Sequence, residues 1–193
     1  MATHRAQAVW EGDLESGIGR VDLESGVAPT LQVSWRQRTG DGVAGQTSPE
    51  ELIAAAHGSC FAMALSLGLS EAGHTPQRLS VAASATIEPT QGGFAITKSQ
   101  LKVRGLVPGI DADAFQEQAR GAAENCPVSR ALRGNVDISV EAELVVDAQH
   151  PRQVLRALQV AAEQVEGDRD AAKHGRLRRP APRCPGCPRP ASC

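Results

Sequence analysis

An apolar run in the first half of the chain constrains the fold more than any other feature of the sequence. Residues 52–72 are rich in Ala and Leu and almost uncharged. Just before them, residues 48–51 read Ser-Pro-Glu-Glu, which places a capping hydroxyl, a first-turn proline and two acids where a helix begins. Gly73 is expected to end the helix. A helix that is apolar on almost every side is buried on most of its faces, so the other elements are expected to pack around it.

Short strands are predicted on both sides of this helix. The residues before it alternate weakly in three runs that we expect to form an antiparallel meander, and those after it begin with two runs joined by a Pro-Thr-Gln-Gly-Gly hairpin. The expected strands are 7–10, 19–24, 31–35, 79–88, 94–106 and 135–145, with a second helix over 111–125 and a helical turn over 127–132. This order predicts an α+β fold in which an antiparallel sheet packs on two central helices.

Charge and cysteine content divide the chain into two parts. Residues 1–146 carry 11 basic and 17 acidic side chains, whereas residues 147–193 carry 9 basic and 5 acidic ones. We therefore expect one domain over 1–146 and an extra C-terminal segment over 147–193. That segment is predicted to hold a helix over 151–166 and then a disordered or loosely extended tail rich in Pro, Arg and Cys.

Composition argues against several classes of partner. The formal net charge is −2 and aromatic residues make up only 3% of the chain, which argues against nucleic acid as a partner. We count no apolar run that approaches the roughly 20 residues needed to span a bilayer, so no membrane partner is expected. The first residues lack the apolar region of a signal peptide, which favours a cytoplasmic location.

Two cysteines of the domain, Cys60 in the apolar helix and Cys126 after the second helix, are the candidates for chemistry. Taken alone, they fit buried small side chains, a redox pair or partial metal ligands. His57 lies three residues before Cys60 on the same helix face and suggests a weak Cys/His metal site, although a satisfied structural histidine explains it more simply. In the tail, Cys184 and Cys187 have C-x-x-C spacing, and Cys193 follows, but no strand–helix context supports a redox role there.

Four blocks of this sequence resemble the osmotically inducible protein C (OsmC) family. They are residues 47–66, 92–98, 107–111 and 125–129, and the similarity covers roughly residues 6–144. The position of His57 and the Phe-Ala-Ile-Thr-Lys block favour the OsmC branch over the sister organic hydroperoxide resistance (Ohr) branch.

The resemblance implies a cysteine-based thiol peroxidase built as an intertwined homodimer. Cys60 maps to the peroxidatic cysteine, Cys126 to the resolving cysteine and Glu50 to the site glutamate. Arg38 is the closest match to the site arginine, with Arg36 as the alternative. The implied substrates are organic hydroperoxides and hydrogen peroxide, in defence against oxidative or osmotic stress.

The implied cycle needs no metal, flavin or haem. Cys60 becomes a sulfenic acid, a Cys60–Cys126 disulfide follows, and an external dithiol of lipoyl or thioredoxin type reduces it. Two other interpretations stay open at this point. One is a non-enzymatic redox sensor that uses the same disulfide, and the other is an inert binding module with structural cysteines.

Helix geometry leads to an expectation about assembly. Glu50 and Cys60 lie ten residues apart on one helix, which is about 15 Å along its axis. A second copy of the chain, packed antiparallel along the apolar helix, would bring the glutamate and arginine of one subunit to Cys60 of the other. Composite sites at a homodimer interface are therefore expected, and residues 147–193 are expected to be dispensable for them.

Overall fold

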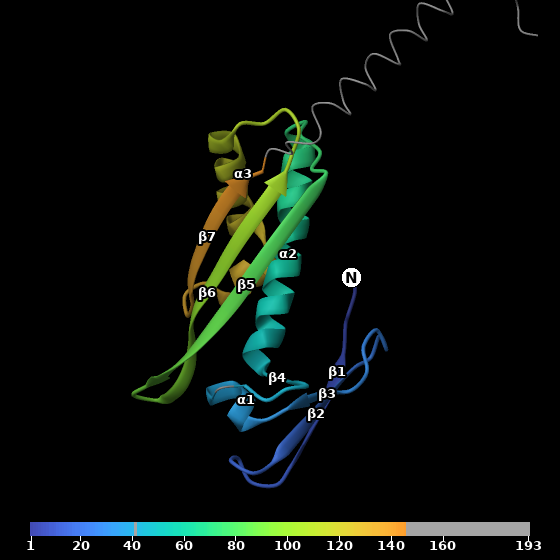
Figure 1. The fold of residues 1–193 in the computed structure, drawn as a ribbon, viewed down its shortest axis with the longest axis vertical. Helices are drawn as coiled ribbons and strands as arrows, with labels where there is room; N and C mark the ends of the chain where they lie inside the picture. Colours follow the sequence, from blue (N-terminus) through green and yellow to red (C-terminus); the bar gives the residue numbers. More distant parts are fainter. Residues whose placement is uncertain (41, 146–193) are drawn as a thin grey trace, which may run out of the picture. The chain divides into compact units, whose positions relative to one another are not determined.

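The structure is a computed structural model that describes residues 1–40 and 42–145 (Figure 1). The helix predicted over 151–166 and the cysteine-rich tail lie outside the described residues. The strands are β1 (Ala6–Glu11), β2 (Ile18–Leu23), β3 (Leu31–Val33), β4 (Gln46–Thr47), β5 (Arg78–Thr90), β6 (Gly93–Leu106) and β7 (Asp137–Leu144). The helices are α1 (Trp35–Thr39), α2 (Pro49–Glu71), α3 (Ala112–Asn125) and α4 (Pro127–Leu132).

Helix α2 begins and ends where the sequence predicts. The Ser48 side chain caps its first turn by accepting a hydrogen bond from the backbone N–H of Glu51 at 3.1 Å. Pro49 occupies the first helical position. At the other end Gly73 has a φ of +84°, a conformation that glycine adopts without strain and that stops the helix.

Strands β5, β6 and β7 form one sheet, which is mixed rather than antiparallel. β5 and β6 make the predicted antiparallel hairpin, but β7 runs parallel to β6, with Leu101 opposite Val140. The expectation of an antiparallel sheet was therefore wrong for this pair. The reason is the connection, because α3 and α4 form a crossover that returns the chain in the direction of β6. The four-stranded sheet β1–β4 is also mixed, since β3 and β4 pair in parallel.

The core lies between α2, α3 and one face of the three-stranded sheet, in two layers (Figure 1). Along β6 every second residue from Ser99 to Gly105 is buried, which points that face at the helices. Gly105 leaves room for the Phe115 ring, which a Cβ at that position would strike. The buried apolar side chains are Phe61, Leu65, Leu69, Leu101, Val103, Val107, Phe115, Ala119, Ala122 and Cys126.

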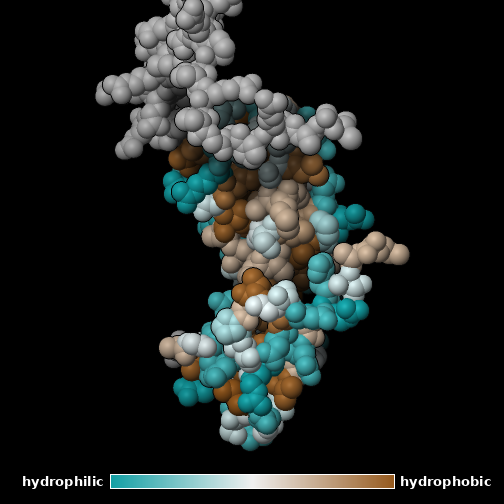
Figure 2. All heavy atoms as spheres, turned by 90° about the vertical axis from the view of Figure 1, so that its right-hand side faces the viewer, coloured by the Kyte–Doolittle hydropathy of each residue, from teal (hydrophilic) through white to brown (hydrophobic). Residues whose placement is uncertain are grey.

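One face of α2 is left exposed by the residues that the structure describes. Met63 and Leu67 are 67% and 61% exposed, so the expectation that this helix is buried on most of its faces fails for a single subunit. Figure 2 shows brown and tan atoms gathered over this side of the molecule. Grooves run along both flanks of the exposed face, one of about 440 Å³ beside β5 and one of about 790 Å³ beside α3.

By length and composition α2 could also cross a membrane. The expectation that no apolar run approaches the length needed to span a bilayer was therefore wrong for α2. One such helix is weak evidence, because the core helix of a soluble protein passes the same test. In this chain Phe61, Leu65 and Leu69 of α2 belong to the packed core.

Candidate active site

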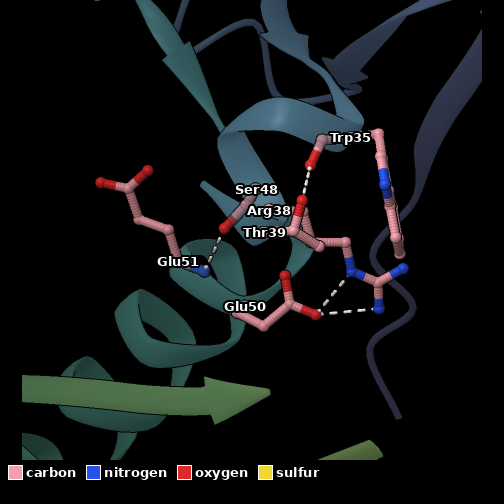
Figure 3. A network of polar contacts seen from close by, with 6 residues as sticks. All are labelled: Trp35, Arg38, Thr39, Ser48, Glu50 and Glu51. Carbon is pink, nitrogen blue, oxygen red and sulfur yellow. Dashed lines mark hydrogen bonds and ion pairs between the residues drawn. The ribbon is translucent and has the colours of Figure 1, made fainter. Parts of the chain in front are cut away.

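Arg38 and Glu50 form an ion pair at the start of α2 (Figure 3). The Nε and Nη2 atoms of Arg38 both lie 2.9 Å from Oε1 of Glu50. The guanidinium also lies over the Trp35 ring, 5.7 Å from its centre. Two hydrogen bonds and a ring face fix the direction of the guanidinium, which a lysine ammonium would not reproduce.

Glu50 is held in a buried position with one oxygen unused. Its carboxylate is in the first turn of α2, where the helix dipole favours a negative charge, and the residue is only 5% exposed. Oε1 takes both contacts from Arg38, whereas Oε2 has no hydrogen-bond partner among the described residues. A buried acceptor without a partner is costly, so this oxygen marks a place where a donor from outside the chain would be favourable.

The two arginines that the sequence left as alternatives lie in different surroundings. Both are on α1 and not on a strand, so the expectation of a strand through Trp35 was wrong at its end. Within the described residues, Arg36 is exposed and makes no ion pair, whereas Arg38 reaches Glu50.

The signal for α1 was present in the sequence. Ser34 and Gln37 have the spacing of a capping box, and the Ser34 side chain accepts a hydrogen bond from the backbone N–H of Gln37 at 3.2 Å. Thr39 closes the turn by donating to the Trp35 carbonyl.

The two cysteines meet where α2 packs against the junction of α3 and α4. Cys60 is partly exposed in the groove between α2 and α3, next to Met63 and Pro127. Cys126 is fully buried and caps α4. Both thiols are free, and their sulfur atoms are near enough to share a hydrogen bond. Such proximity is the first condition for a disulfide between them.

The surroundings of the two sulfurs shift their acidity in opposite directions. Burial raises the pKa of the Cys60 thiol, and Cys126 raises it further, against a backbone N–H of Val128 that lowers it. Burial also raises the pKa of Cys126, but hydrogen bonds from Ser129, Cys60 and Val128 outweigh it, so the pKa of Cys126 lies below its ordinary value. No cation of the described residues contributes to the pKa of Cys60.

The predicted site residues therefore fall into two groups. Arg38 and Glu50 lie together at the N-terminus of α2, and Cys60 and Cys126 lie together about 15 Å further along the helix axis. A single chain does not bring the guanidinium to the thiol.

The ring beneath the guanidinium belongs to an aromatic pair. Trp35 makes an edge-to-face contact with Phe94 of β6, with ring centres 5.2 Å apart. A pocket of about 300 Å³ opens beside them, and it is mostly apolar apart from Ser34 and Arg38. It is lined by Trp10, Leu14, Val33, Ser34, Trp35, Arg38 and Pro49.

His57 faces the interior of the domain. Its two ring nitrogens are bound to the hydroxyls of Ser99 and Ser129, which agrees with a satisfied structural histidine. Within residues 1–40 and 42–145, no group of three or more His, Cys, Asp or Glu side chains is placed to hold a metal ion.

Known proteins resemble this chain in sequence and in fold. The profile of the family described as OsmC-like protein matches residues 40–141. The chain is 44% identical to the peroxiredoxin OsmC of Escherichia coli K12 over 142 residues, which cover 73% of this chain and 98% of that protein. It is 34% identical over 102 residues to the organic hydroperoxide resistance protein of Xanthomonas axonopodis pv. citri, covering 52% of this chain and 67% of the relative.

A solved structure shows that the fold is shared as well. The crystal structure of the organic hydroperoxide resistance protein OhrB of Bacillus subtilis superposes with a TM-score of 0.58 at 28% identity, covering 72% of this chain and 98% of that one. The fold and the cysteine pair define a thiol-based redox protein of α+β architecture. The chain belongs to the OsmC family of peroxiredoxins.

Proposed function

We propose that this protein is a cysteine peroxidase that reduces organic hydroperoxides, and hydrogen peroxide less selectively, with Cys60 as the nucleophile and Cys126 as the resolving thiol. The observation that carries the proposal is the pair of free thiols within hydrogen-bonding reach, one partly exposed in a groove and one buried behind it. The family relatives are peroxiredoxins and hydroperoxide resistance proteins, which supports this chemistry.

The catalytic cycle has three steps. The Cys60 thiolate attacks the outer peroxide oxygen, the O–O bond breaks, and the alkoxide leaves as an alcohol after taking up a proton. Cys126 then attacks the sulfenic sulfur, the S–O bond breaks, and water is released as the disulfide forms. A dithiol reduces the disulfide and is itself oxidised to a disulfide.

The first step needs a cation beside Cys60, and a second copy of the chain is the proposed source. Burial holds the pKa of Cys60 high in the single subunit, so the thiolate would be scarce. An antiparallel partner along α2 would bring its Arg38 to this sulfur and its Glu50 alongside. The exposed Met63 and Leu67 and the unused Oε2 of Glu50 support this composite site, because pairing would cover the apolar face and could supply the missing donor.

The same geometry bears on how the disulfide is reduced. Cys126 is fully buried, whereas Cys60 opens to the groove beside α3, so an incoming dithiol would attack the sulfur of Cys60 and release Cys126. A lipoyl or thioredoxin-type dithiol is the proposed reductant. Two free thiols suit a reducing compartment, which supports a cytoplasmic location.

Turnover with cumene hydroperoxide and dihydrolipoamide tests the proposal. We expect each subunit to consume many equivalents of peroxide, and we expect peptide mass spectrometry to detect a Cys60–Cys126 crosslink when the dithiol is omitted. Consumption of about one equivalent would instead support the redox sensor that uses the same disulfide. Neither consumption nor crosslink would leave only an inert module with structural cysteines.

A further inference from the structure

His57 belongs to a buried hydrogen-bond chain that the proposed catalytic cycle does not use. The chain starts at Ser99 on β6, passes through the imidazole on α2 and reaches Ser129 on α4. Nδ1 of His57 lies 2.7 Å from the Ser99 hydroxyl, and Nε2 lies 2.8 Å from the Ser129 hydroxyl. All three side chains are at most 1% exposed.

The donor and the acceptor of each hydrogen bond in this series can be assigned from where the protons must lie. The Ser99 hydroxyl is fully buried, and its one side-chain hydrogen bond among the described residues is to Nδ1 of His57. A buried hydroxyl proton without an acceptor is costly, so Ser99 donates and Nδ1 accepts. Burial lowers the pKa of His57 and keeps the ring neutral, so its one proton is on Nε2, which donates to Ser129.

The last link reaches a reacting atom. Because Ser129 accepts from His57, its own hydroxyl proton remains free to be donated. Ser129 lies three residues after Cys126, in the first turn of α4, and its hydroxyl and backbone N–H both lower the pKa of that cysteine. The hydrogen-bond chain thus runs from Ser99 through His57 to Ser129, and the Ser129 hydroxyl is the donor to Cys126.

We propose that His57 is a positioning residue for disulfide formation, which aims the Ser129 hydroxyl at Cys126 and stabilises the thiolate that attacks Cys60. This inference rests on the proposed function. In the step concerned, the Cys126 thiolate forms the S–S bond, the S–O bond of the Cys60 sulfenic acid breaks, and the departing hydroxide joins the proton that Cys126 gave up to form water. The same hydrogen bonds stabilise the Cys126 thiolate when it leaves during reduction of the disulfide by a dithiol.

The test measures the lifetime of the Cys60 sulfenic acid in the full-length chain. Each protein receives one equivalent of cumene hydroperoxide, and the adduct with dimedone and the Cys60–Cys126 crosslink are followed by peptide mass spectrometry. Cys126→Ser gives the upper limit of adduct. We expect His57→Leu and Ser129→Ala each to slow crosslinking about tenfold, the effect of losing a hydrogen bond to a charged group, with peroxide consumption in the first turnover unchanged.

Two further variants separate positioning from a general loss of structure. In His57→Gln the amide N–H can replace Nε2 as the donor to Ser129, so crosslinking should recover most of its speed. In the double variant His57→Leu with Ser129→Ala, the effects should not add, because both changes break one chain that ends at the same atom.

Each contrary result is informative. Crosslinking at the wild-type rate in both single variants, with adduct accumulating in Cys126→Ser, would overturn the role of His57 while leaving the proposed function standing. Additive losses in the double variant would also overturn it. If neither adduct nor crosslink forms in the unaltered protein, both proposals fall.

Discussion

Two arginines that lie two residues apart on α1 show how one side chain becomes part of a site. Arg38 makes two contacts of 2.9 Å to Glu50 and stacks over Trp35, whereas the exposed Arg36 makes no ion pair within the described part of the chain. The difference is one of geometry and not of charge, because both residues carry the same guanidinium group.

The same substitution made at Arg38 and at Arg36 should affect peroxidase activity differently. Arg38→Lys keeps the charge but loses the forked pair of donors, so we expect peroxidase kcat/KM to fall about tenfold or more. Arg36→Lys is the control and should stay within about twofold of the unaltered protein, as expected for an exposed charge. Equal losses in the two variants, measured with cumene hydroperoxide, would argue against Arg38 as the site arginine.

His57 should give the protein a pH-dependent stability. Burial lowers its pKa in the folded chain, while the unfolded chain titrates near the ordinary value of about 6.5. Above that value neither state binds the proton, and the stabilisation is complete. As the pH falls below about 6.5, His57 binds a proton in the unfolded chain but stays neutral in the folded chain. The free energy of unfolding therefore decreases.

Urea unfolding at several pH values measures this effect. Between about pH 7 and pH 5 the midpoint should fall more steeply for the unaltered protein than for His57→Gln, which cannot titrate. Parallel curves for the two proteins would show that His57 is not held neutral.

The sequence indicated the proposed site residues but not the hydrogen-bond partners of His57. Cys60 and Cys126 stood out by residue type and motif, whereas Glu50 and Arg38 were indicated only by the resemblance to the family. The partners of His57 could not be foreseen, because Ser99 and Ser129 come from other elements, 42 and 72 residues away along the chain. Only packing of α2 on the sheet and on α4 brings them together.

At the scale of elements, α2 combines two surfaces. One side supplies Phe61, Leu65 and Leu69 to the core, and the other leaves Met63 and Leu67 in solvent. Periodicity in the sequence could not separate these sides, because the helix is apolar in nearly every direction and has no dominant stripe. The parallel pairing of β7 was equally hidden, since alternation within a strand carries no information about its direction.

A charge placed on the exposed side of α2 should act on assembly. We expect Leu67→Lys to shift the protein to monomers in sedimentation velocity and to lower peroxidase activity about tenfold or more, because the charge would have to be desolvated in an apolar interface. Val27→Lys is the control, since Val27 is also apolar and is 80% exposed, but lies outside α2. An active monomer carrying Leu67→Lys would contradict the composite site.

At the scale of the whole molecule, the distribution of the site residues raises the question of whether one chain can form a complete site. The ion pair of Arg38 and Glu50 and the thiol pair of Cys60 and Cys126 occur at separate places along α2, and the acidity of Cys60 is unfavourable in one chain. The domain over 1–146 was predicted from charge and composition. The expectation of a second chain came from helix length, and Oε2 of Glu50, which has no hydrogen-bond partner among the described residues, supports that expectation.

Complementation between two inactive variants measures this dependence directly. A mixed dimer of Arg38→Ala and Cys60→Ser subunits contains one complete site, made from the thiol of the first chain and the guanidinium of the second. Coexpression with two different affinity tags isolates that dimer. Random pairing before isolation should restore about a quarter of the unaltered activity per chain, because half of the dimers are mixed and each has one working site of two. An isolated mixed dimer no more active than Arg38→Ala alone would show that Arg38 does not serve the cysteine of its partner.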